Sequence, residues 1–508
     1  MNVGEDVDVI ADARVVLPAT PLPLGDEPHD VHLRGGVVAD IAPAGALPRR
    51  GRVLDAAGGW LIPGLWDHHV HVMQWALVAE RMPLRHAESA MHAAALMSSV
   101  PVRSDGRRIG TGYRDALWND APDLATLDAA TGEVPTYLIN ADVHSVWLNS
   151  AALRREGIGD PGDGVLREEP AFAISRRLNA VDPTGVDRSV ASAARDAAAR
   201  GLVGVVDLDM AWNEQSWQRR TASGFDLLRV DFGIYPADLE RAIEAGLRTG
   251  APLRGANTDL VRVGPVKVIS DGSLGTRTAA CSHPYTGATG VGISAGGARG
   301  GGAMTVEPAD VERIMAAATA GGLTCAIHAI GDVAVSHALD AFTRTGAAGS
   351  IEHAQLVAHA DLPRFARVGV AASVQPEHAL DDRDISDREW AAQTALAYPL
   401  RSLADAGATV LFGSDAPVAD LDPWAGIAAA VYRARAGGPA WHPEETVSVA
   451  TALQASTRSG TPGADRTAPG VRADFALCAT DPRAADEQHL RDMQVAATLL
   501  GGRLTHLV

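Results

Sequence analysis

The stretch LWDHHVHV, residues 65–72, is the starting point for predicting the fold of the chain. It follows a Pro-Gly pair and predicts a β-strand. In a strand, residues two apart share a face, so His69 and His71 point one way and His68 points the other. Two imidazoles on one face at the end of a strand can bind a single metal ion. Asp67 shares their face and either supports a ligand or is a structural polar residue, while His68 adds a third imidazole that could compete as a ligand.

Seven further strand-like segments follow, separated by helix-like stretches such as residues 311–321 and 400–408. They are GLVGVVDLD (201–209), DLLRVDFGIY (226–235), LVRVGPVKVIS (260–270), GLTCAIHAI (322–330), SIEHAQ (350–355), GVAASVQP (369–376) and TVLFGSDAP (409–417). Eight strands alternating with helices predict an α/β fold, a closed (β/α)8 barrel. One segment, about 73–195, does not fit the repeat and is predicted to be an insertion over the barrel mouth.

Both ends of the chain carry short valine-rich segments bounded by Gly, Pro and Asp, which are typical of small β-sheets. They occupy residues 7–62 and the last forty or so residues, where a Gly-Gly pair in QVAATLLGGRLTHLV (494–508) signals a hairpin. The two sets could pair into one small domain, with the barrel inserted between them. Two independent β tails are the alternative.

The composition of the chain limits which binding partners and which cellular location we expect for the protein. The 508 residues carry a net charge of −18, which argues against nucleic acid or an anionic membrane as a partner. The three cysteines lack CxxC spacing, so neither a disulfide framework nor a cysteine zinc site is expected. No signal peptide and no long apolar run is recognised. We expect a cytoplasmic protein with a small-molecule substrate, and a homodimer remains open.

Residues with metal-ligand chemistry recur at the ends of the predicted barrel strands, where barrel enzymes gather catalytic groups. They are His328, His353 and Asp415. Lys267 lies in the fourth strand and is the single lysine of the chain, although Lys and Arg together number 44. Arginine stays protonated, whereas a desolvated lysine can become a neutral amine and do covalent chemistry. Lys267 is therefore a candidate for a reaction that arginine cannot perform.

Five motifs occur in a fixed order: PGLWDHHVH, KVISDGS, IHAIGD, IEHAQ and FGSDAPV. In this order they resemble the amidohydrolase superfamily, in particular its family 3 branch, which includes N-substituted formamide deformylases. The resemblance covers essentially the whole chain. It implies a distorted TIM barrel over residues 63–465 and a composite β-sandwich domain built from residues 1–62 and 466–508.

The resemblance also implies a binuclear metal site. His69, His71 and Asp415 would hold one divalent ion, His328 and His353 a second, with zinc the expected metal. Lys267 would react with CO2 to form a carbamate that bridges both ions, because burial favours its neutral amine. The implied reaction is hydrolysis of a C–N bond other than a peptide bond, in an amide such as an N-substituted formamide, through a metal-bridging hydroxide. Asp415 would act as general base and then as general acid.

Substrate contacts are predicted on the insertion and on loops that follow strand ends. They are Asp142, His144, Asn149, Arg277, Tyr285, Gln375 and His378. Ordinary loop hydrogen bonding is the alternative for each. Two alternatives to the hydrolase stay open: a metal-free barrel lyase that uses Lys267 as a Schiff-base nucleophile, and a noncatalytic scaffold.

Overall fold

The computed structural model describes residues 1–508 except 17–25, 80, 104, 116–117, 142–144, 160, 168, 180–182, 257, 276, 287–299 and 462–464. The chain divides into two compact units. One contains residues 1–72 and 194–508, and the other contains residues 73–193. The first unit holds both a barrel and a separate β-sheet.

Eight parallel strands form the barrel sheet, in the order β20-β18-β16-β15-β14-β13-β12-β6. Their bounds are β6 Leu65–Val70, β12 Leu202–Asp207, β13 Arg229–Ile234, β14 Val261–Ile269, β15 Cys325–Ala329, β16 Gly349–His353, β18 Ala371–Val374 and β20 Val410–Phe412. A parallel bridge between Val70 and Ala416 joins the two outermost strands, and Asp415 N donates to His69 O at 2.8 Å. Each predicted strand is present, and the distorted (β/α)8 barrel is confirmed.

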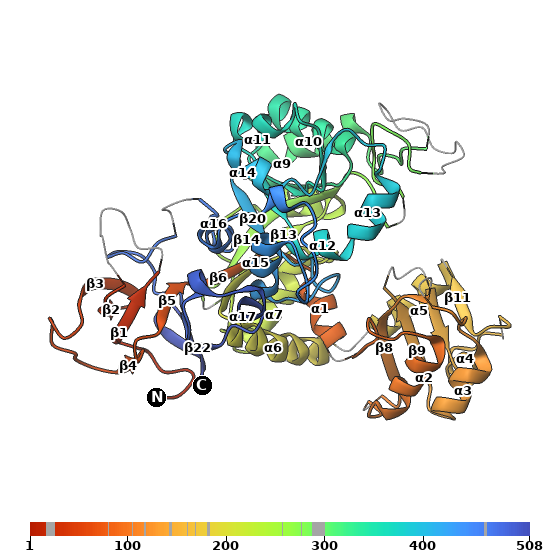
Figure 1. Ribbon diagram of the computed structural model, residues 1–508, viewed down its shortest axis with the longest axis horizontal. Coiled ribbons are helices and arrows are strands. Elements are labelled where there is room, and N and C mark those ends of the chain that lie inside the picture. The colour runs from red at the N-terminus through yellow and green to blue at the C-terminus, as the bar shows by residue number, and fades with distance from the viewer. Residues whose placement is uncertain are drawn as a thin grey trace. The chain divides into compact units, whose positions relative to one another are not determined.

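Helices surround the barrel strands in Figure 1. They are α6 Pro183–Ala199, α7 Asn213–Ala222, α8 Leu239–Glu244, α9 Pro308–Ala320, α10 Asp332–Thr345, α11 Leu362–Val368, α12 Pro376–Asp381, α13 Arg383–Glu389, α14 Leu400–Asp405, α15 Pro423–Tyr432, α16 Val449–Ala455 and α17 Glu487–Arg491. In α10, Val335, Leu339 and Phe342 recur at helical spacing and are buried, so one face of the helix packs inward.

The two ends of the chain build one β-sheet, as predicted for a composite β-sandwich domain. Its strands are β1 Val9–Val15, β2 His29–Arg34, β3 Val37–Pro43, β4 Val53–Asp55, β5 Trp60–Pro63, β21 Phe475–Cys478, β22 Val495–Leu500 and β23 Arg503–Leu507. Antiparallel pairing of β5 with β21 joins the N-terminal and C-terminal halves. Gly4 N donates to Leu504 O at 2.8 Å, and the two termini lie side by side in Figure 1. Independent β tails are thereby excluded.

Residues 73–193 form a compact unit with its own five-stranded sheet, in the order β11-β10-β9-β8-β7. Its elements are α1 Val72–Ala79, β7 Met82–Pro83, α2 Ala90–Ser99, β8 Arg108–Tyr113, α3 Leu124–Thr131, β9 Thr136–Asn140, β10 Ser145–Leu148, α4 Ser150–Glu156, β11 Val165–Arg167 and α5 Glu169–Asn179. Two apolar clusters, one around Trp147 and one around Tyr137, form its core. The position of this unit over the barrel mouth stays a prediction.

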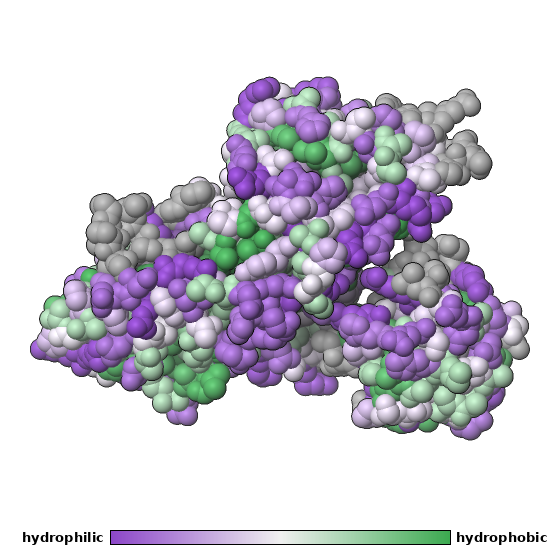
Figure 2. Space-filling model, viewed as in Figure 1, coloured by the Kyte–Doolittle hydropathy of each residue, from purple (hydrophilic) through white to green (hydrophobic). Residues whose placement is uncertain are grey.

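The surface seen in Figure 2 mixes both kinds of residue, with hydrophobic ones in separate patches among hydrophilic ones. Within the described ranges, no helix combines the length and the apolar character that crossing a membrane requires.

Candidate functional site

The predicted metal-site residues all lie at the carboxyl ends of barrel strands. His69 is on β6 and His71 follows that strand directly. Lys267 and His328 are the third-last and second-last residues of β14 and β15, and His353 ends β16. Asp415 lies just beyond β20. Because the eight strands are parallel, their carboxyl ends share one end of the barrel.

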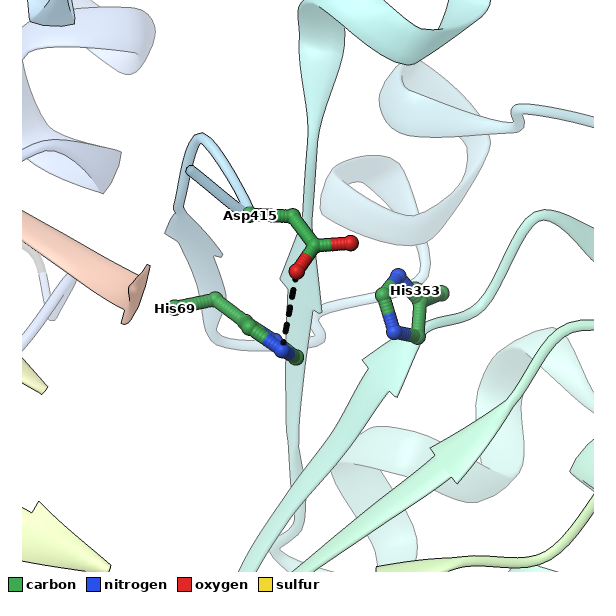
Figure 3. A group of neighbouring side chains, drawn as sticks. All are labelled: His69, His353 and Asp415. Atoms are coloured by element: carbon green, nitrogen blue, oxygen red, sulfur yellow. Dashed lines mark ion pairs between the residues drawn. The ribbon is translucent and has the colours of Figure 1, made fainter. Parts of the chain in front are cut away.

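The centre of this group is formed by His69, His353 and Asp415 (Figure 3). Among the described residues, the ligand atoms of these three all lie within 4.8 Å of one another. His69 Nε2 is 3.4 Å from Asp415 Oδ1, and His71 Nε2 is 3.3 Å from the same oxygen. Imidazole nitrogens and a carboxylate are the donors that Zn²⁺ and similar ions take in proteins. The centre therefore fits a divalent cation.

Lys267 and His328 adjoin the centre from β14 and β15. Lys267 is 1% exposed, and its Nζ lies 3.4 Å from His69 Nε2. Burial lowers the pKa of Lys267 to about 8, although the carboxylates of Glu352 and Asp415 act in the opposite direction. The ring of His328 lies 4.4 Å from the ring of His353, measured between centroids. Because the pKa of Lys267 is about 8, part of its amine is neutral near neutral pH.

The imidazoles are suited to donate lone pairs. Burial lowers the pKa of His69, lowers that of His328 to about 3 and holds that of His353 well below its usual range. A neutral imidazole has one nitrogen free to act as an electron-pair donor. His71 Nδ1 is buried and has no hydrogen-bond partner in the part of the chain that the structure describes. His69, His328 and His353 can therefore hold cations without first losing a proton, whereas Asp415 counters the effect of burial and raises the pKa of His71.

Neighbouring groups fix which nitrogen each ring presents. His353 Nδ1 lies 2.9 Å from Gln375 Oε1, which leaves Nε2 available. His328 Nε2 lies 3.2 Å from Gly272 O and 3.4 Å from Asp271 Oδ1, which leaves Nδ1 available. Supporting hydrogen bonds of this kind fix the tautomer and orientation of metal-binding histidines.

Backbone strain coincides with the site. His353 has φ 72° and Asp415 has φ 57°, both in the left-handed region that residues with a side chain rarely adopt. Such conformations cost free energy and persist where the surrounding structure enforces them, commonly at active sites. The backbone at the end of β16 and in the turn after β20 thus orients the side chains of His353 and Asp415.

Sequence reasoning missed Glu352 and gave no role to Asp271. Glu352 Oε2 lies 2.7 Å from His69 Nδ1. Burial alone would raise the pKa of Glu352, but His69, Lys267 and Ser350 together lower it to about 2. Asp271 accepts backbone hydrogen bonds from Ala280, Ile330 and Gly331 beside His328. A carboxylate inside each of two ligand motifs, IEHAQ and KVISDGS, was the available signal.

The two other polar residues of β6 have structural partners. Asp67 Oδ1 accepts from the backbone N–H groups of His69 and Ser414, each at 3.0 Å. Its carboxylate thereby ties β6 to the segment after β20. His68 Nε2 lies 2.9 Å from Thr457 O, so His68 is directed away from the other histidines, as strand alternation predicted.

The predicted substrate contacts lie in diverse settings. Gln375 adjoins His353, and the ring of His378 stacks 6.4 Å from that of His353. The Arg277 guanidinium is paired with Glu389 at 2.7 Å, and Tyr285 OH is buried and donates to Ala279 O. Asn149 is buried in residues 73–193, where its side chain caps α4. Asp142 and His144 lie outside the described residues. Substrate contact by these side chains stays a prediction.

Comparison with known proteins identifies the family. A family model described as "Amidohydrolase family" matches residues 52–506. Protein LONG AFTER FAR-RED 3 of Arabidopsis thaliana is 28% identical, covering 88% of this chain and 82% of its own. The N-substituted formamide deformylase of Arthrobacter pascens is 25% identical, covering 91% of each chain. The crystal structure of an uncharacterized metal-dependent hydrolase from Pyrococcus horikoshii is 23% identical, covers 95% of this chain and 99% of its own, and superposes with a TM-score of 0.78.

Proposed function

Since this chain belongs to the amidohydrolase family, we propose that it is a binuclear metal-dependent hydrolase that cleaves a non-peptide C–N bond. The observation that carries the proposal is the buried group of His69, His353 and Asp415, whose ligand atoms lie within 4.8 Å of one another. Its relative from Arthrobacter pascens, an N-substituted formamide deformylase, supports an amide of this class as the substrate.

The residues divide between two ions in the proposal. His69, His71 and Asp415 would hold the first ion, and His328 and His353 would hold the second. Lys267 would be the ligand that both ions share, as a carbamate: its neutral amine adds to CO2, an N–C bond forms as one C=O π bond opens, and the nitrogen releases one proton. Divalent ions bound there would lower the pKa of a water molecule and polarise a substrate carbonyl. Zinc is the expected metal, since histidine and carboxylate ligands suit it.

Asp415 is the proposed proton carrier. Burial alone would raise the pKa of Asp415, but His69, His71 and His353 hold this pKa well below its usual range. The carboxylate is therefore ionised and able to accept a proton from water. The attacking water gives a proton to Asp415 as the new C–O bond forms. Asp415 returns that proton to the departing nitrogen as the C–N bond breaks. The products are a carboxylic acid and an amine.

The single lysine makes the carbamate directly testable. Protein incubated with ¹³C-bicarbonate should show a carbamate carbon resonance that is absent from Lys267→Arg. That variant should also lose metal, and its activity should fall by at least about 100-fold. Arg262→Lys is the matched control, because it adds a lysine at a less buried position of β14; it should add no second resonance.

Three results would contradict the proposal: a fully metallated and active Lys267→Arg variant, a carbamate signal that survives in this variant, or borohydride trapping of a carbonyl substrate on Lys267. The last would instead identify a Schiff-base lyase. A cytoplasmic location, the lack of nucleic-acid and membrane partners, and a homodimer stay predictions.

A further inference from the structure

A small pocket adjoins the proposed metal site. His353 and Gln375 form part of its wall, and Leu403 of α14 and Arg433, which follows α15, form another part. Its volume is about 20 Å³, which exceeds what one water molecule needs. Apart from His353, Gln375 and Arg433, its lining is almost wholly apolar. The pocket lies within the unit that contains the barrel.

Arg433 is the unusual part of this wall. Its side chain is 1% exposed, its Nε donates to Trp441 O at 3.0 Å and its Nη1 donates to Tyr398 O at 3.4 Å. The guanidinium also lies over the Trp441 ring, 5.1 Å from the centroid. Nη2 has no hydrogen-bond partner among the described residues. The partners of Arg433 are thus carbonyl oxygens and a ring, all of them uncharged.

Among the described residues, no carboxylate forms an ion pair with this guanidinium. Burial lowers the pKa of Arg433 to about 10, and Glu445 acts in the opposite direction, but the carboxylate of Glu445 is bound by the backbone N–H and the hydroxyl of Ser402. Arginine remains protonated even so. A buried charge that lacks a partner is strongly unfavourable, so an arrangement of this kind is suited to an anion that arrives from outside.

We propose that this pocket binds a carboxylate of the substrate, with Arg433 donating hydrogen bonds to its oxygens. A carboxylate matches the planar guanidinium and is held more strongly between apolar walls than in water. The inference rests on the proposed hydrolase function, because His353 belongs to both the pocket wall and the metal site. The substrate class is then an N-acyl compound that carries a carboxylate near the scissile amide.

Acetate is a probe that tests the pocket without catalysis. Replacing chloride by acetate at constant ionic strength should raise the melting temperature of wild-type protein saturably, both with metal and after chelation. Arg433→Met should abolish this rise and Arg433→Lys should weaken it. Arg241→Met is the matched control, because Arg241 also stacks on a tryptophan, Trp212, but is largely exposed; it should keep the rise. Equal melting temperatures in both salts, or an equal rise in Arg433→Met, would overturn the proposal.

A substrate pair separates this inference from the proposed function. N-formylalanine and N-ethylformamide differ by the carboxylate alone. The wild-type enzyme should favour N-formylalanine in kcat/KM, and Arg433→Met should reduce that ratio by at least about tenfold. Hydrolysis of both compounds with no preference would overturn the carboxylate pocket and leave the hydrolase intact. An acetate effect that depends on Arg433, without hydrolysis of either compound, would support the anion site and contradict the proposed function.

Discussion

At the scale of single residues, Glu352 has the clearest positioning role. Its carboxylate lies 2.7 Å from His69 Nδ1 and also accepts from Ser350 Oγ, which leaves His69 Nε2 facing Asp415. Glu352→Gln keeps the shape and removes the charge. Because such partners raise ligand basicity and fix the ring, we expect metal affinity to fall about 10- to 100-fold, measured by competition with a chelator of known affinity.

Glu389→Gln is the control for this prediction. Glu389 is equally buried, but its carboxylate is bound by Arg277 and Arg388. Its replacement should lower stability and leave metal affinity unchanged. If the two variants lose metal equally, Glu352 has no specific role in positioning His69.

The residue scale also sets the limit of prediction from sequence. His69, Lys267 and His353 could be predicted because they lie near the ends of strands that the sequence predicts locally. The bond between Glu352 and His69 could not, because β16 and β6 are not neighbours in the sheet. Their approach across the barrel depends on its closure. The environment of Arg433 likewise depends on segments that are distant in the sequence, so its lack of a nearby carboxylate among the described residues could not be predicted.

At the scale of elements, the spacing of β15 and β16 holds His328 and His353 together. Gly349 begins β16 with φ 149°, and a Cβ there would lie 1.8 Å from Cys325 O. Gly349→Ala must therefore push the two strands apart. We expect a loss of about 3 kcal/mol in the free energy of unfolding, measured by urea denaturation, together with weaker metal binding.

Gly346→Ala, three residues earlier, separates crowding from backbone strain. Gly346 follows α10 with φ 65°, and a Cβ there would meet nothing within 4 Å. The cost should be about 1 kcal/mol, the strain of the left-handed conformation alone, with metal affinity unchanged. Equal losses in the two variants would show that strand spacing is not the cause.

The elements themselves were largely predictable. Local sequence patterns located all eight barrel strands. Most of them, such as β12 and β14, are mainly apolar runs because they are buried on both faces. The pairing of β5 with β21 was left open against independent tails, because more than four hundred residues separate the two strands. Long-range pairing of this kind is decided by packing rather than by local sequence.

At the scale of the whole molecule, the two compact units should respond differently to metal removal. The proposed ligands all belong to the unit of residues 1–72 and 194–508, whereas residues 73–193 have apolar clusters of their own. Anything that binds only the folded state stabilises it, by about 2.7 kcal/mol at 100 times its Kd. Calorimetry should therefore resolve two unfolding transitions, and a chelator should lower only one of them.

Limited proteolysis at increasing temperature, with and without chelator, identifies which unit unfolds in the transition that shifts. Fragments from residues 194–508 should appear at a lower temperature after chelation, while fragments from residues 73–193 should appear at an unchanged one. Lys267→Arg should behave like chelated wild-type protein whether or not metal is added, because the bridging ligand is missing. If a chelator shifts both transitions equally, the two units unfold together. If it shifts neither, bound metal does not stabilise the folded barrel, which contradicts the prediction.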